Sequence, residues 1–396
     1  MGISKNKTKL LVIAPSLPRY DRNSGDHRLF KILSILSQTN KITYYSLGDI
    51  REGVVEEERY RSALENLDIT IYDKDHSLFN ILKMHEFDAA IIEFYDVAGY
   101  CLPVIKIVQS NCPVIIDSVD LHYRRAFMKY SVTKSGDDYD NANKIKENEI
   151  KIYEMADMVI TVTDEEAYLL REESKKLRIR TIPNIHELQI QNGSSDKHNL
   201  LFVGGFSHEP NIDAVSWFCD EIFPDILNEI PNAKLTVVGS DPPDQILNYR
   251  SDSIIILGYV PSLAPIFREN YISIAPLRYG AGMKGKIGEA MAYGLPVVTT
   301  HIGAQGMDLV HRVNAMVSDS PSDFSNSVIE MMKNDTLYNS IRQNAIQHVT
   351  NISGVESITK IINSIIDEIK NISINPLPFA HKVKFLTNYM KTKLFA

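Results

Sequence analysis

Glycines and cationic residues alternate in one short stretch of this sequence, PLRYGAGMKGKIGEAMAYGLPVV, residues 276–298. An apolar run typical of a buried strand precedes the stretch, and a helical pattern begins within it. Glycines let a backbone approach a ligand, cationic side chains balance negative charge, and a helix N-terminus adds partial positive charge. The stretch therefore predicts a pocket for a diphosphate. The residues expected to line it are Arg278, Gly282, Met283, Lys284 and Lys286.

Two neighbouring features extend this predicted pocket. Glu289 lies one turn into the helix, where its carboxylate could accept hydrogen bonds from the two hydroxyls of a ribose; a first-turn Glu also simply complements the helix dipole. Gly204 and Gly205 follow the strand-like run LLFV, and their N–H groups could face an anion, although an ordinary tight turn explains such a pair equally well. No GxxxxGK[ST] motif is present, which argues against an ATPase of that class.

Strand-length apolar runs alternate with amphipathic helical patterns along most of the 396 residues. Such alternation predicts an α/β fold with parallel sheets covered on both faces, and the length favours two domains. We expect two doubly wound, Rossmann-like domains, 1–184 and 199–370, that face a central cleft. The polar segment 185–198 is the expected linker, and residues 371–396 are expected to pack back on the first domain. Thr163 and Glu166 form a predicted capping box before a helix.

Composition excludes several classes of protein. The net charge of -8 and the ordinary fractions of charged and apolar residues do not suggest a nucleic-acid binder. Cys101, Cys112 and Cys219 lie far apart without metal-ligand spacing, so no structural metal is expected. The N-terminal run is too short for a signal peptide and no 18-residue apolar segment occurs, which favours a cytoplasmic location.

The C-terminal stretch PLPFAHKVKFLTNYMKTKLFA has a composition of its own. It contains four lysines and no acidic residue, and its apolar residues fall near one face of a helix. This pattern is typical of a basic amphipathic helix on an anionic membrane surface, and equally of a terminal helix that packs on its own domain.

Several runs in the second half resemble a known family. The runs are LFVGGFSHEPNIDAVSWFCDEIFPDI, AKLTVVGSDPP, IIILGYV, APLRYGAGMKGKIGEAMAYGLPVVTT and IGAQGM. Together they resemble the nucleotide-sugar half of the GT-B glycosyltransferases of family 4, the group 1 retaining enzymes. Glu289 matches the second glutamate of the family's E-x7-E signature, whereas Ala281 replaces the first. The resemblance implies that the donor diphosphate is held by Lys284, Lys286 and Arg278 without a metal ion.

The first half resembles the family more loosely, in APSLPRYDRNSGDHRLFKILSIL and VIIDSVDLHYRRA. The resemblance places Gly25, Asp26, His27 and Arg28 beside the cleft, as residues expected to bind the acceptor. It also places His122 near the transferred sugar, although a surface histidine after a strand would look the same. Asp120 and Arg124 could orient His122 or bind acceptor hydroxyls, and Asp96 and Glu93 are weaker candidates for that job.

We therefore expect a retaining glycosyltransferase that moves a hexose-type sugar from a nucleoside diphosphate to a hydroxyl of a saccharide or lipid-linked acceptor. The catalytic candidates are His122, Lys286 and Arg278. Two alternatives stay open. A nucleotide-sugar 2-epimerase would share the architecture, and a catalytically silent nucleotide-sugar-binding subunit would fit Ala281 and the basic tail.

Overall fold

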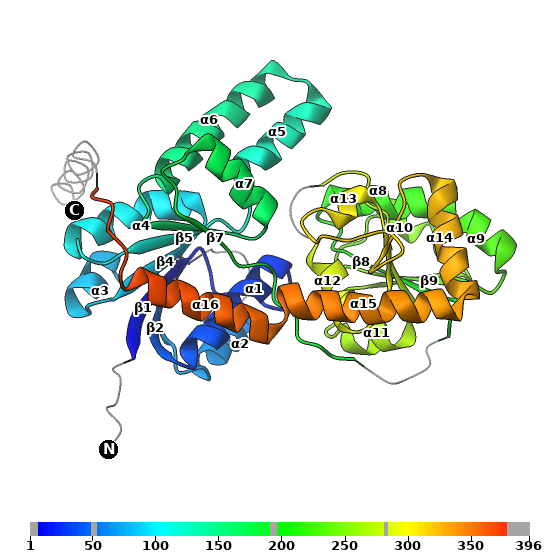
Figure 1. Ribbon diagram of the computed structural model, residues 1–396, viewed down its shortest axis with the longest axis horizontal. Coiled ribbons are helices and arrows are strands. Elements are labelled where there is room, and N and C mark those ends of the chain that lie inside the picture. The colour runs from blue at the N-terminus through cyan, green and yellow to red at the C-terminus, as the bar shows by residue number, and fades with distance from the viewer. Residues whose placement is uncertain (1–6, 49–53, 191–195, 281–283, 378–396) are drawn as a thin grey trace. The chain divides into compact units, whose positions relative to one another are not determined.

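The computed structural model describes residues 7–48, 54–190, 196–280 and 284–377. The chain forms two compact units (Figure 1). The first unit contains residues 1–183 together with 359–396, and the second contains residues 184–358. Each unit is built around one parallel β-sheet, as the alternation of strands and helices predicts.

The first unit is built on a seven-stranded parallel sheet of order β3-β2-β1-β4-β5-β6-β7. The strands are β1 (Thr8–Ala14), β2 (Asn40–Ser46), β3 (Thr70–Tyr72), β4 (Ala89–Glu93), β5 (Val114–Asp117), β6 (Met158–Thr161) and β7 (Ile179–Thr181). Their side chains are buried on both faces, which is typical of a sheet that helices cover on two sides. Leu11, Ile13, Ile92 and Ile116 lie in the centre of its core.

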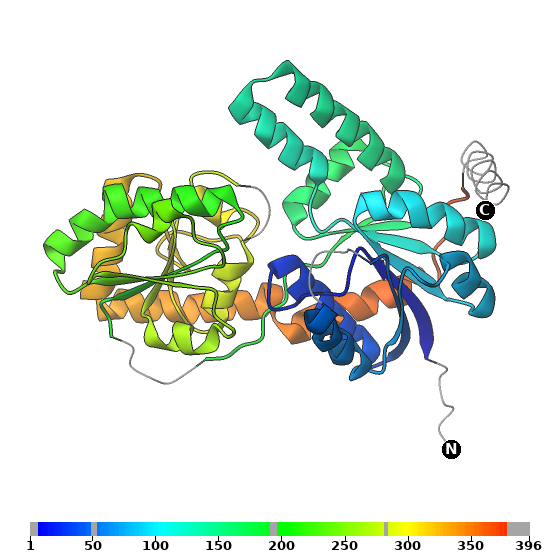
Figure 2. The ribbon, with the colours of Figure 1, turned by 180° about the vertical axis from the view of Figure 1, so that it is seen from behind.

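Helices lie on both faces of this first sheet (Figure 2). They are α1 (Ser24–Ser37), α2 (Val54–Glu65), α3 (Leu78–Met84), α4 (Tyr95–Val108), α5 (His122–Thr133), α6 (Gly136–Tyr153) and α7 (Asp164–Glu173). Helices α5 and α6 form a hairpin that projects from the sheet (Figure 1). The capping box predicted at Thr163 and Glu166 is confirmed at the start of α7.

The second unit has a six-stranded parallel sheet of order β10-β9-β8-β11-β12-β13. Its strands are β8 (Asn199–Val203), β9 (Lys234–Val238), β10 (Ile254–Gly258), β11 (Ile272–Ala275), β12 (Val297–Thr299) and β13 (Met316–Val317). The helices are α8 (Glu209–Trp217), η1 (Phe218–Ile222), α9 (Phe223–Glu229), α10 (Asp244–Leu247), α11 (Ala264–Glu269), α12 (Gly285–Ala292), α13 (His301–Ala304), α14 (Pro321–Lys333) and α15 (Asp335–Ser353).

The chain returns to the first unit in α16 (Val355–Ile369), the last helix of the described ranges. Arg180 in β7 donates to the Ser364 hydroxyl at 3.0 Å and pairs with Glu368 at 3.5 Å. The expected end of the second domain at residue 370 is therefore corrected to residue 358. Sequence periodicity identifies a helix but not the sheet on which it packs.

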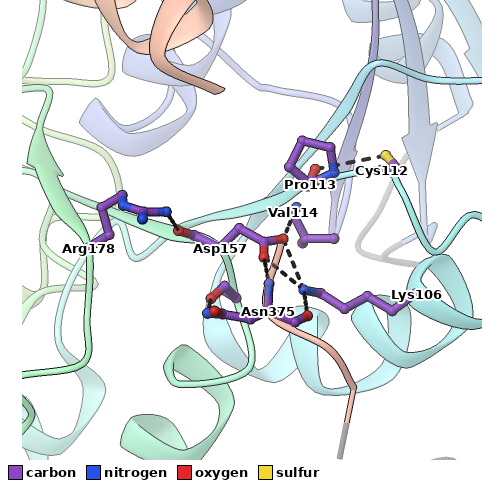
Figure 3. Close-up of polar contacts among 8 residues, drawn as sticks. Lys106, Cys112, Pro113, Val114, Asp157, Arg178 and Asn375 are labelled. Carbon is purple, nitrogen blue, oxygen red and sulfur yellow. Dashed lines mark hydrogen bonds and ion pairs between the residues drawn. The ribbon is translucent and has the colours of Figure 1, made fainter. Parts of the chain in front are cut away.

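Residues beyond α16 continue along the first unit. Lys106, Asp157 and Asn375 form a closed set of hydrogen bonds there (Figure 3). Leu377 is buried in the same core. The rest of the tail that was expected to pack on this unit, 378–396, lies outside the described residues.

The first residues of the expected linker 185–198 pack on the second unit. Ile185 is fully buried, the His186 N–H donates to the Ser353 carbonyl at 2.9 Å, and the Gln189 N–H donates to Ala292 at 3.0 Å. These contacts make residues 184–189 part of the second unit. Residues 191–195 lie outside the described ranges.

Candidate active site

Each sheet has a topological switch point, where the strand order reverses and two neighbouring strands send their connections in opposite directions. In the second sheet this point lies between β8 and β11, and in the first between β1 and β4. Ligands of open α/β sheets bind outside the carboxyl ends of the strands at such points. The loops after β8 and β11 contain the residues predicted to bind a donor, and the loops after β1 and β4 lie beside those predicted to bind an acceptor.

The turn after β8 is tightly packed against the neighbouring strand. The Gly204 N–H donates to the Val238 carbonyl at 2.9 Å, and a Cβ on Gly239 would lie 1.9 Å from the Gly204 oxygen. The Asn211 side chain donates to the Gly205 carbonyl at 2.7 Å and would collide with a Cβ on Gly204. Close packing thus requires a glycine at position 204, whereas a Cβ on Gly205 would lie 3.4 Å from the Ser240 hydroxyl.

Arg278, in the loop after β11, is already paired. Its guanidinium forms two hydrogen bonds with the Asp213 carboxylate of α8, one of them at 2.9 Å from Nε, and it lies 5.5 Å from the Trp217 ring centroid. Asp213 raises the pKa of Arg278 further. Sequence reasoning missed both partners, because acidic and aromatic residues on a helix carry no signal that they face a loop 65 residues away.

The N-terminal turn of α12 carries the other described donor candidates. Lys284 occupies the N-cap position, and the Lys286 ammonium lies 2.8 Å from a carboxylate oxygen of Glu289. Both members of this pair are partly exposed. Gly282, Met283 and the departure from the signature at Ala281 lie outside the described residues.

Helix α1 begins at the carboxyl edge of the first sheet. Asn23 caps it by accepting from the Asp26 N–H at 2.8 Å, and Asp26 in turn accepts from Asn23 and from the Arg19 N–H. Burial raises the pKa of Asp26. A Cβ on Gly25 would lie 3.5 Å from Val119, so this turn fits closely against the loop after β5.

Two predicted acceptor residues have structural contacts instead. Arg28 is 1% exposed, and its guanidinium donates to Asp117 at 2.7 Å and to the Ile182 carbonyl at 2.8 and 3.0 Å. The expected acceptor contact of Arg28 is therefore corrected to a buried ion pair that ties α1 to β5. A ring nitrogen of His27 lies 3.0 Å from the Tyr20 carbonyl.

His122 is the first residue of α5. Its Nε2 lies 3.1 Å from Asp120, and its ring contacts the rings of Phe94 and Tyr95 at centroid distances of 5.8 and 5.0 Å. Asp120 thus lies beside the His122 ring, and it also pairs with Arg125 at 2.9 Å. Arg124, by contrast, pairs with Glu165 of α7.

Buried and strained residues surround His122. Glu149 of α6 is fully buried and accepts from the N–H groups of His122 and Tyr123, which stabilises the N-terminus of α5. Phe94 and Val119, at the ends of β4 and β5, have φ angles of 66° and 59°. Positive φ is costly for such side chains, and strained residues of this kind cluster at functional sites.

Residues 197–334 match a family model described as Glycosyl transferases group 1. This part of the chain is therefore similar to group 1 glycosyltransferases. A Klebsiella pneumoniae protein described as an uncharacterized 44.6 kDa protein in cps region is 28% identical over 177 residues, which are 42% of this chain and 46% of that protein. The match thus spans about half the length of this curated relative.

Solved structures with the same fold cover nearly the whole chain. Sucrose-phosphate synthase from Thermosynechococcus elongatus aligns with a TM-score of 0.66 at 16% identity, over 92% of this chain and 99% of that one. HepE from Anabaena, in complex with UDP, aligns with a TM-score of 0.68 at 13% identity, over 91% and 100%. The two parallel sheets match GT-B glycosyltransferase structures, so the predicted fold class is confirmed.

Proposed function

We propose that this protein transfers a hexose-type sugar from a nucleoside diphosphate to a hydroxyl group, with retention of configuration at the anomeric carbon. The observation that carries the proposal is the position of Lys286 and Glu289 on the first turns of α12, next to the switch point of the group 1 domain. HepE, which shares the fold, has been solved with UDP-glucose, which supports a uridine diphosphate donor.

In this proposal the second unit binds the donor and the first unit binds the acceptor. Lys284, Lys286 and the N-terminal N–H groups of α12 stabilise the negative charge that develops on the leaving diphosphate, without a metal ion. Arg278 assists, since its pair with Asp213 uses only two of five N–H donors. Glu289 binds the ribose hydroxyls, Gly204 and Gly205 allow close approach, and Gly282 and Met283 complete the loop.

His122 is the proposed catalytic residue of the first unit. Its Nε2 lies beside Asp120 and its ring contacts two aromatic rings; in this proposal the other ring nitrogen forms a hydrogen bond with a sugar hydroxyl. The acceptor in this proposal is a saccharide or lipid-linked saccharide of cell-surface polysaccharide synthesis. The Klebsiella relative in the cps region supports this assignment.

We also propose a cytoplasmic location with peripheral contact to an anionic membrane. No helix in the described ranges is long and apolar enough to cross a membrane. A groove of about 1070 Å³ lies at the amino edge of the first sheet. The charged residues that line it are Lys7, Lys9, Lys41, Lys370, Asp68 and Asp88. The basic tail follows residues 372–374 in the sequence, and lysines of the groove and of the tail would both be attracted to an anionic surface.

The function is tested by incubating the protein with UDP-, GDP-, ADP- and dTDP-sugars and mono- and disaccharide glycosides, with product analysis by mass spectrometry. The proposal expects a new glycoside and the released nucleoside diphosphate. A free epimerised sugar would instead support a 2-epimerase. Nucleotide-sugar binding without any turnover would support a silent binding subunit.

A further inference from the structure

Glu93 is the last residue of β4, one of the two strands that flank the switch point of the first sheet. It is paired in register with Asp117 at the end of β5. Its side chain is buried, with 4% of the residue exposed. The strained residue Phe94 follows it, and the Phe94 ring contacts His122.

The polar groups around Glu93 form hydrogen bonds with other partners and not with Glu93. Arg28 donates to Asp117 and to Ile182, and Asp26 accepts from the turn that caps α1. Within the described part of the chain, no hydrogen bond or ion pair reaches the Glu93 carboxyl. The buried Glu93 side chain is therefore open to a hydrogen-bonding partner that this part of the chain does not supply.

Burial, followed by the charges of Asp117 and Asp26, raises the pKa of Glu93 well above its usual value. The charge of Arg28 lowers the pKa of Glu93, but the Arg28 guanidinium forms its ion pair with Asp117. The other titratable group that faces Glu93 is Tyr44 of β2, whose hydroxyl donates to the Ser16 carbonyl at 2.6 Å. These surroundings favour the protonated form of Glu93, and a protonated carboxyl group both donates and accepts a hydrogen bond.

We propose that Glu93 binds a hydroxyl group of the saccharide acceptor at the switch point of the first sheet. This inference rests on the proposed function. A sugar hydroxyl also donates and accepts, so it matches both halves of a protonated carboxyl. A cation would fit poorly here, because the neighbouring carboxylate of Asp117 is already neutralised by Arg28. A site of this kind discriminates strongly against a deoxy sugar, because the buried carboxyl group is left without a hydrogen-bonding partner when the hydroxyl is missing.

The test measures saccharide binding directly, by saturation-transfer NMR in the presence of UDP. The probes are the methyl α-glycosides of glucose, galactose and mannose, and N-acetylglucosamine. Glu93→Gln keeps a donor and an acceptor and should bind within about threefold of the wild type, whereas Glu93→Leu should bind at least about tenfold more weakly. Glu147→Leu, an exposed position of α6, is the matched control.

A second measurement does not depend on the folding of Glu93→Leu. Wild-type saccharide binding should weaken as pH rises, because the carboxyl loses its donor proton, while Glu93→Gln should stay constant. Equal binding by Glu93→Leu, or an identical pH profile for wild type and Glu93→Gln, would overturn the inference. So would the absence of any saccharide signal from a wild type that binds UDP. If the wild type binds no nucleotide, the donor assignment of the proposed function fails instead.

Discussion

The ammonium of Lys106 lies 2.9 Å from the carboxylate of Asp157, and neither side chain is more than 2% exposed. The same carboxylate accepts from the N–H groups of Val114 and Asn375, and Lys106 also donates to the Asn375 carbonyl (Figure 3). A buried ion pair is stable only when its remaining hydrogen-bonding positions are filled. Here residue 375, close to the end of the described chain, fills them.

Removal of the segment that contains Asn375 should destabilise the first unit. We expect deletion of residues 375–396 to lower the stability of that unit by at least about 1–3 kcal/mol, because buried polar atoms of Lys106 and Asp157 lose partners and the buried side chain of Leu377 is removed. Deletion of residues 378–396 is the matched control and should leave it unchanged. Hydrogen exchange of β5 and β6, measured by mass spectrometry, reports on this unit alone. Equal exchange in the two truncated proteins would contradict the prediction.

Glu166 should make stability depend on pH. Burial raises its pKa from 4.5 to about 7, against the backbone hydrogen bonds that it accepts. Because the folded state holds the proton more tightly, this contribution is complete below about pH 4.5 and is lost as pH rises through about 7. Glu166→Gln does not titrate, so its melting temperature relative to the wild type should rise between pH 5 and 8, by the equivalent of at most about 3 kcal/mol. Glu172→Gln, an exposed change on the same helix, should show no such trend.

The separate contributions of Lys286 and Glu289 to UDP binding can be measured with single variants. Lys286→Ala should weaken UDP binding by roughly 10- to 100-fold, the loss of a charge-assisted hydrogen bond. Glu289→Gln should also weaken binding if Glu289 contacts the ribose, but should leave it unchanged or stronger if Glu289 only neutralises Lys286. Calorimetric titration with UDP distinguishes these outcomes, with Lys234→Ala in β9 as the control. Unchanged binding by Lys286→Ala would remove that residue from the donor site.

Gly239 should tolerate no side chain. A Cβ there would lie 1.9 Å from the Gly204 carbonyl oxygen, which is backbone and cannot rotate away. We expect Gly239→Ala to destabilise the second unit by more than about 3 kcal/mol, beyond ordinary overpacking. At Gly205 the nearest atom would be the Ser240 hydroxyl at 3.4 Å, so Gly205→Ala should cost far less. Fluorescence of Trp217, the single tryptophan, follows unfolding of this unit.

The basic tail and the groove at the amino edge of the first sheet can be tested separately for membrane contact. Deletion of residues 378–396 should reduce co-sedimentation with phosphatidylglycerol vesicles by at least about tenfold, since each lysine near an anionic surface contributes about 1 kcal/mol. Changing Lys9 and Lys41 to Glu should reduce it further, and added salt should do the same. Changing Lys234 and Lys333 to Glu in the second unit is the matched control. If the intact protein does not sediment with these vesicles, the membrane contact does not exist.

Local patterns in the sequence were sufficient for the architecture and for part of the site. Apolar runs that alternate with helical patterns specify a parallel sheet, because only a sheet covered on both faces buries such runs. The glycines and lysines at 276–298 predicted a strand-to-helix junction with an anion-binding character, and β11 and α12 meet there. These features depend on residues that are close in the chain.

Contacts between distant residues decided the rest. Arg28 and Asp117 are 89 positions apart, and Asp157 and Asn375 are 218 apart. An arginine beside a predicted loop reads equally well as a ligand contact or as half of a buried ion pair. The sequence by itself determined the two α/β units and the junction at α12. Only the tertiary structure decided that Arg28 is buried, that the chain returns to the first unit and that Glu93 has no polar partner among the residues the structure describes, because burial and charge pairing depend on how the elements pack.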